Sequence, residues 1–136
     1  MGRTIAIIAP IVAVCMSLFH LYTGCFGSLD PWSQRVIHLT LGFLITFLSY
    51  PVLKGKKISY FDVLLALASL VSGSYIILNM DALVDRAGMP TTLDVVFGVL
   101  TILLVLEMTR RVIGLALVIV SALFLLYAYF GPYLPE

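Results

Sequence analysis

The sequence predicts an all-α fold, a polytopic membrane helical bundle of about five transmembrane helices, with four helices as the alternative. Hydrophobic residues make up 62% of the 136-residue chain, charged residues make up only 11%, and the mean hydropathy is +1.13. A water-soluble domain of this size has too small a core to bury so much apolar surface. Long apolar stretches separated by short polar segments lead to the same prediction, and we expect residues 1–136 to form a single transmembrane domain.

Each transmembrane helix needs about 20 mostly apolar residues, because a residue rises about 1.5 Å through a hydrocarbon core of about 30 Å. Stretches near this length predict spans at about residues 4–22, 36–53, 60–78, 92–109 and 112–130. The first stretch contains Pro10, which neighbouring helices tolerate in a membrane. No small-x-small cleavage site ends that stretch, so we interpret it as an uncleaved span rather than as a secretory signal.

Two of the predicted spans begin with a capping signature. Ser59 with Asp62, and Thr91 with Asp94, each have the S/T-x-x-D spacing. In this arrangement, side-chain oxygens accept bonds from the free backbone N–H groups of a helix start. The two signatures therefore predict helix starts close to residues 60 and 92.

The boundary between the last two predicted spans is defined by charge alone. Thr109, Arg110 and Arg111 include no turn residue, so one long bent helix with a buried arginine pair is the alternative to a loop. Glu107 and Arg110 have the i, i+3 spacing that brings opposite charges together, and Arg111 adds a second guanidinium for a carboxylate or a phosphate. We interpret this group as an anchor at the cytoplasmic boundary. The alternative is a contact with a partner subunit or a lipid headgroup.

Lysine and arginine residues predict the orientation of the bundle. With five spans and a cytoplasmic N-terminus, most of them fall on the cytoplasmic side, where such residues concentrate: Arg3, Lys54, Lys56, Lys57, Arg110 and Arg111. Only Arg35 and Arg86 then lie outside. We expect the lysines and the arginine pair to anchor the chain against anionic lipid, at about 1 kcal/mol per charge.

Ionisable residues inside a membrane are candidates for function, because burying a charge in lipid costs roughly 2.5 to 3.5 kcal/mol. His20 ends the first predicted span and His38 begins the second. We expect both near the outer interface, where a neutral imidazole can bond to a carbonyl or a headgroup. Asp62 lies beside the lysine segment, and we interpret it as a helix cap or as part of a surface ion pair.

Ser69 and Gly73 form a small-xxx-small pair on the third predicted span, and Ala66 lies on the same side. Such pairs let helix backbones approach closely in a membrane. We therefore expect a packing face here. Like the charged group at Glu107, Ser69 and Gly73 are candidate contacts with a partner subunit.

Motifs of catalysis and of self-sufficient transport are missing from the sequence. It holds no Walker-type GxxxxGK[ST], no metal-spaced Cys/His cluster, no Ser/His/Asp grouping at one depth and no row of arginines. Cys15 and Cys25 would lie about 15 Å apart along one helix, too far for a disulfide. We expect no enzyme activity, catalytic residue, cofactor, bound metal or nucleic-acid partner, and we interpret the chain as an accessory or scaffold subunit.

The second half of the chain resembles a known transporter family. Three runs carry the likeness: Arg-Ala-Gly-x-Pro-Thr at 86–91, Leu-Glu-x-Thr-Arg-Arg at 106–111 and Tyr-Ala-Tyr-Phe-Gly-Pro-Tyr-Leu-Pro at 127–135. Together they resemble the small-subunit portion of TRAP (tripartite ATP-independent periplasmic) transporters of the TAXI type, which commonly forms the front end of a fused permease. Val118 departs from the proline that similar sequences often have. The chain also stops at Glu136, where fused relatives continue.

The resemblance implies a division of labour. In that family, an extracytoplasmic TAXI-type substrate-binding protein captures an organic anion, and a large permease subunit moves it by an elevator motion coupled to an ion gradient. The small subunit widens the static scaffold and binds neither substrate nor coupling ion. The resemblance thus implies a multi-pass protein of a bacterial or archaeal cytoplasmic (inner) membrane, whose partners are the large permease, the substrate-binding protein and membrane lipids.

Two other functions stay open at this point. The chain could be the small membrane subunit of another tripartite carrier, such as the tricarboxylate type. It could also be a homo-oligomeric small channel or exporter, which needs polar residues along a common pore. The candidate pore residues form no clear stripe: His38, Thr46, Ser69, Ser72 and Ser74.

Overall fold

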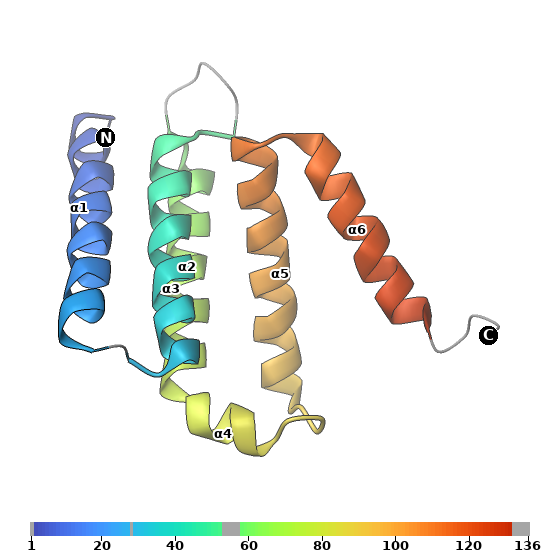
Figure 1. Cartoon of the computed structure of the whole chain (residues 1–136). Coiled ribbons are helices and arrows are strands. Elements are labelled where there is room, and N and C mark those ends of the chain that lie inside the picture. The colour runs from blue at the N-terminus through green and yellow to red at the C-terminus, as the bar shows by residue number, and fades with distance from the viewer. Residues whose placement is uncertain (1, 28, 53–57, 132–136) are drawn as a thin grey trace.

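The computed structural model of the chain describes residues 2–27, 29–52 and 58–131, with side chains from residue 7 onward, and shows an all-α fold (Figure 1). The described residues form six helices: α1 (Gly2–Phe26), α2 (Pro31–Ser49), α3 (Tyr60–Leu78), α4 (Met80–Asp85), α5 (Thr92–Val112) and α6 (Leu115–Phe130). The prediction of an all-α fold is therefore confirmed.

Three helices among the described residues are long and apolar enough to cross a membrane: Ile7–Phe26 within α1, Tyr60–Leu78 and Thr92–Val112. These helices indicate a multi-pass membrane protein, and they support three of the five expected spans. α2 has 19 residues, but Gln34 and Arg35 in its first turns lower its hydropathy. α6 has 16 residues and at about 1.5 Å per residue is about 24 Å long, shorter than a hydrocarbon core of about 30 Å.

Local capping explains why α2 begins at Pro31 rather than at residue 36 as expected. The Asp30 carboxylate accepts backbone N–H bonds from Trp32 and Ser33, both 3.1 Å long. Pro31 occupies the first helical position, where a missing N–H loses no helix bond. This start extends α2 into the polar residues that follow Asp30.

The end of α2 at Ser49 also differs from the expected end at residue 53. Pro51 explains this difference, because a residue that precedes proline is biased away from helical backbone. Tyr50 accordingly has φ −115° and ψ 94°, which is extended backbone. Residue 53 itself lies outside the described residues.

Capping boxes start α3 and α5 at the predicted positions. Asp62 accepts the backbone N–H of Ser59 at 2.8 Å, and Asp94 accepts the backbone N–H of Thr91 at 2.8 Å. α3 occupies the expected residues 60–78, and α5 begins at the expected residue 92. The capping signatures were therefore sufficient to place both helix starts.

The break between α5 and α6 lies at Gly114, beyond the arginine pair. Gly114 has φ +112°, a left-handed backbone conformation that glycine adopts easily and other residues rarely adopt. The break between the helices therefore lies a few residues beyond the boundary expected at residues 109–112, because Arg110 and Arg111 belong to the last turn of α5. The alternative of one continuous bent helix is wrong, although its buried arginine is present at Arg111.

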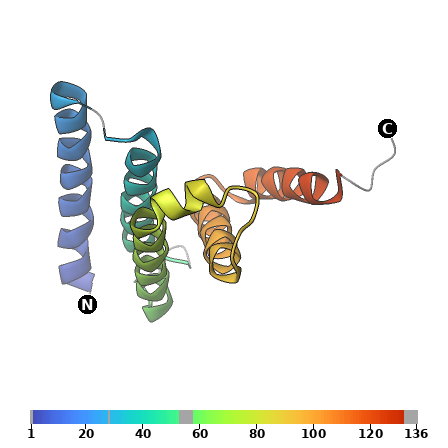
Figure 2. The same ribbon diagram turned by 90° about the horizontal axis from the view of Figure 1, so that it is seen from below.

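α2, α3 and α5 pack together around the core of the bundle. Phe43 and Phe47 from α2, Ala66 from α3 and Leu104 from α5 are the buried hydrophobic residues of this core. α1 lies along the outer side of α2, and α6 projects away from α5 on the opposite side (Figures 1 and 2). The two outermost helices therefore flank a three-helix centre.

Small residues allow α2 and α3 to approach closely. Ala66, Ser69 and Gly73 are buried on α3. A Cβ atom added at Gly73 would overlap the hydroxyl of Thr40 on α2 and lie 3.0 Å from its methyl carbon. The small residues thus lie on a packing face, as expected, and this face is occupied within the chain. A contact of Ser69 and Gly73 with a partner subunit stays a prediction without structural support.

Replacing Gly73 with alanine should lower the free energy of unfolding by about 1–3 kcal/mol, because the added methyl group overpacks this contact. Thr40 cannot easily turn aside, since its hydroxyl also donates to the Val36 carbonyl at 2.8 Å. Gly42→Ala is the matched control, because a Cβ atom there meets nothing within 4 Å. Unfolding in mixed detergent micelles, followed by circular dichroism, measures both variants. Equal stability of the two would contradict the close approach.

Candidate functional site

A buried ion pair joins the first turn of α3 to the last turn of α5. Arg111 Nη1 lies 2.7 Å from Asp62 Oδ1, and the two side chains are 2% and 0% exposed. A charge in such surroundings is stable only when an opposite charge and hydrogen bonds compensate it. The expectation for Asp62 was therefore right about the helix cap and wrong about the ion pair, which is buried rather than on the surface.

Backbone groups add hydrogen bonds to this pair, whereas Arg111 Nη2 is buried with no hydrogen-bond partner among the described residues. Asp62 accepts the N–H groups of Ser59, at 2.8 Å, and Val52, at 3.2 Å. Arg111 Nη1 also donates to the carbonyl of Tyr50 at 2.8 Å. Since Tyr50 and Val52 follow the end of α2, the ion pair connects α2, α3 and α5 at one end of the bundle.

An aromatic ring supports the same guanidinium. The Cζ atom of Arg111 lies 4.9 Å from the centroid of the Phe47 ring on α2. A guanidinium over an aromatic face gains cation–π attraction, which is larger where water is excluded. Phe47 is itself 0% exposed and belongs to the hydrophobic core. The charged cluster and the core are therefore in direct contact.

Glu107 holds both arginines of α5. Its carboxylate accepts two bonds from Arg110, from Nε at 2.7 Å and from Nη2 at 2.8 Å, and a third from Arg111 Nε at 2.8 Å. The predicted i, i+3 contact of Glu107 with Arg110 is thus present, and Glu107 bonds to Arg111 as well. With Asp62, the cluster contains two carboxylates and two guanidinium groups, so its formal charges cancel.

Two of the expected membrane anchors, Arg110 and Arg111, belong to this cluster, and the three lysines lie outside the described residues. Arg110 is 36% exposed and remains available to a headgroup, whereas Arg111 is used inside the chain. Lys54, Lys56 and Lys57 lie outside the described residues, in the segment that connects α2 to α3. Their role as anchors stays a prediction.

A second polar cluster joins α3 to α5 at the other end of these helices. Tyr75 donates its hydroxyl to Asp94 at 2.6 Å, and Arg86 donates to the same carboxylate oxygen at 3.2 Å. Between the two ends, the hydroxyl groups of Ser72 and Thr101 lie 2.6 Å apart. α3 and α5 are thus connected at three levels along their length.

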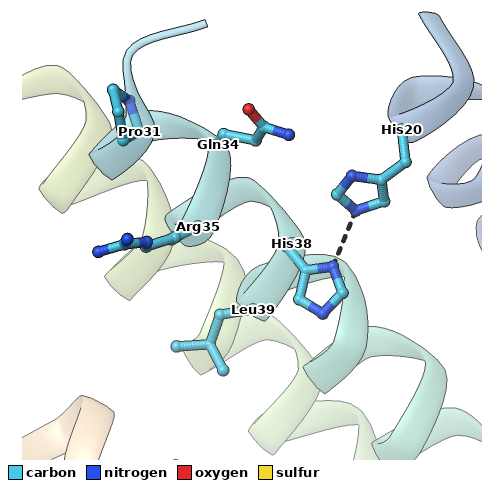
Figure 3. A pocket seen from close by; sticks show the side chains of 6 residues that line it. All are labelled: His20, Pro31, Gln34, Arg35, His38 and Leu39. Carbon is cyan, nitrogen blue, oxygen red and sulfur yellow. Dashed lines mark hydrogen bonds between the residues drawn. The ribbon is translucent and has the colours of Figure 1, made fainter. Parts of the chain in front are cut away.

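The two histidines of the chain face each other across α1 and α2 (Figure 3). His20 Nε2 and His38 Nδ1 lie 2.8 Å apart, which is a hydrogen-bond distance. From the sequence we named a carbonyl or a headgroup as a partner that each ring can bond to, and the structure shows the two rings bonded to each other. Their placement at similar depths on consecutive helices was the signal that could have revealed the pair.

Comparison with known proteins does not identify a family for this chain. No protein-family model, no curated protein and no solved structure matches the chain. The described residues contain no group of three or more His, Cys, Asp or Glu side chains that could hold a metal ion. The clusters at Arg111 and Asp94 connect helices within the chain.

Replacing Arg111 with alanine should lower the free energy of unfolding by about 3–5 kcal/mol, because it leaves the Asp62 carboxylate buried without its partner. Arg110→Ala is the matched control one residue away. It breaks a partly exposed pair with Glu107 and should cost no more than about 1 kcal/mol. Unfolding of both variants in mixed detergent micelles tests the difference, and a smaller effect at Arg111 than at Arg110 would refute it.

Proposed function

We propose that this chain is the small scaffold subunit of a TAXI-type TRAP transporter, a secondary transporter for organic anions, and that it packs against the large permease subunit. The runs that resemble the family lie in the second half of the sequence, which includes α4, α5 and α6. The observation that carries the proposal is the arrangement of α6. None of the residues Leu115–Phe130, all of which the structure describes, is buried within the chain.

The exposed surface of α6 suits contact with another membrane helix. Leu123, Phe124 and Tyr127 are 61%, 70% and 67% exposed. An open groove of about 460 Å³ runs between α5 and α6, and its lining includes the hydroxyl-bearing residues Thr109 and Ser121. Small and hydroxyl-bearing residues are common where membrane helices pack. A partner helix in this groove would also support α6, which is too short to cross a bilayer upright.

The buried polar residues of the bundle support a scaffold rather than a pore. Thr46, Ser69 and Ser72 were candidate pore residues for a homo-oligomeric channel, and they are 8%, 1% and 1% exposed. Ser69 donates to the Ala66 carbonyl at 2.7 Å, and Ser72 bonds to Thr101. Ser69 and Ser72 are thus used inside the chain, whereas two other candidates, His38 and Ser74, are exposed. We also propose that the chain itself carries no catalytic or substrate-binding residue.

Charge supports one orientation for this subunit. The first residues of α1, the end of α2 and the end of α5 lie at the same end of the bundle (Figure 1). Arg110 and Arg111 belong to that end, and so do the end of α2 and the start of α3 (Figure 1), between which Lys54, Lys56 and Lys57 lie in the sequence. By the preference of basic residues for the cytoplasmic side, we place this end in the cytoplasm of a bacterial or archaeal cell.

Co-purification tests the proposal. The chain, tagged and produced in its natural host, should recover a large many-span permease in equal amount after solubilisation in mild detergent, as judged by mass spectrometry. The identity of that permease also separates the TAXI type from the tricarboxylate type. Recovery of the chain alone, as a defined oligomer, would contradict the scaffold proposal and favour a small channel.

A matched pair of substitutions tests the position of the interface. Ser121→Trp fills the groove between α5 and α6 and should reduce recovery of the permease at least fivefold. Ser17→Trp adds the same bulk to an exposed position on α1 and should leave recovery unchanged. Equal recovery with both variants would show that the permease binds elsewhere.

A further inference from the structure

His20 and His38 are the two histidines of the chain, and both belong to one pair. They are separated by 18 residues and belong to different helices, yet their ring centroids are 4.9 Å apart. Figure 3 shows the two rings turned toward each other, with one nitrogen of each at the shared bond. A hydrogen bond here requires one nitrogen to carry a proton and the other to present a lone pair.

We propose that this histidine pair binds a divalent transition-metal ion such as Zn²⁺ or Cu²⁺. Imidazole nitrogen is a preferred ligand of these ions. Two nitrogens on a tetrahedral zinc ion, each about 2.0–2.1 Å from the metal, lie about 3.3 Å apart. The observed separation is 2.8 Å. A small outward movement of the two rings therefore admits the ion, and the shared proton moves to the other nitrogen of the ring that carried it.

The surroundings of the pair admit a hydrated ion. An open groove of about 570 Å³ adjoins the rings, so water can supply the remaining ligands. The lining residues include no carboxylate: His20, Pro31, Gln34, Arg35, His38 and Leu39. A site with nitrogen ligands and no carboxylate favours zinc or copper over calcium or magnesium.

The one cation in the lining does not oppose the metal at close range. Figure 3 shows the Arg35 side chain directed away from the two imidazole rings. Its guanidinium carbon lies 5.9 Å from the centroid of the Trp32 ring, on the same helix. Arg35 therefore borders the groove without occupying the space between the histidines.

A metal at this position would connect α1 to the rest of the bundle. α1 packs chiefly on α2. A second hydrogen bond between side chains of α1 and α2, from Gln34 to Thr23, is long at 3.4 Å. An ion held by both helices would stabilise their contact, because a ligand that binds only the folded state favours it. Acid should release the ion, since protons compete for the same two nitrogens. The site does not depend on the proposed scaffold function.

Electron paramagnetic resonance of bound Cu²⁺ tests the site directly. The protein is purified with a tag that contains no histidine, and Cys15 and Cys25, both exposed, are replaced by serine so that thiols neither bind nor reduce copper. The spectrum should show one copper per chain with two imidazole nitrogens. Because the chain has only two histidines, this count identifies both ligands.

Substitution of each histidine tests whether both side chains are copper ligands. His20→Gln and His38→Gln should each reduce the count to one nitrogen and weaken copper binding at least tenfold. Ser17→Ala changes an exposed residue of α1 that does not line the groove, leaves both rings in place and should change neither result. A spectrum without two imidazole nitrogens in the protein that retains both histidines would overturn the proposal, and that measurement does not require any histidine variant to fold.

Discussion

Arg111 and Asp62 are buried where α2, α3 and α5 meet, and neither charge could stay there alone. Each ion loses several kcal/mol of hydration on burial, so the pair depends on every group that surrounds it. The carbonyl of Tyr50 is free to accept a bond because Pro51 has already ended α2. The backbone N–H of Ser59 bonds to Asp62 because the capping box starts α3 at that point. The ends of three helices are therefore determined together.

The centre of the bundle is connected by buried and half-buried polar contacts, and α1 and α6 flank it (Figures 1 and 2). Ser72 with Thr101, and Tyr75 with Asp94, continue the connection of α3 to α5 beyond the ion pair. α6 leaves the bundle at Gly114 and contributes no buried residue among Leu115–Phe130. The scaffold role that we propose needs a surface for a partner subunit, and the exposed α6 is the candidate for that surface.

Signals within a few residues of sequence predicted some helix boundaries correctly, but they did not predict contacts between distant residues. The capping boxes at Ser59 and Thr91 act within four residues, and they predicted the starts of α3 and α5 correctly. Asp30 followed by Pro31 is an equally local signal for the start of α2. The ion pair of Asp62 with Arg111 joins residues 49 apart, and no spacing rule reaches so far. The break at Gly114 was missed because a single glycine is common inside membrane helices.

The central claim is that Asp62 and Arg111 stabilise the bundle as a pair, and a double-mutant cycle tests it most directly. Asp62→Asn, Arg111→Met and the double variant are unfolded in mixed detergent micelles, and their stabilities are compared with that of the natural chain. Each single substitution leaves a buried polar partner uncompensated. We therefore expect the double variant to be more stable than the two single effects predict, by at least about 2 kcal/mol. Additive effects within about 0.5 kcal/mol would contradict the account.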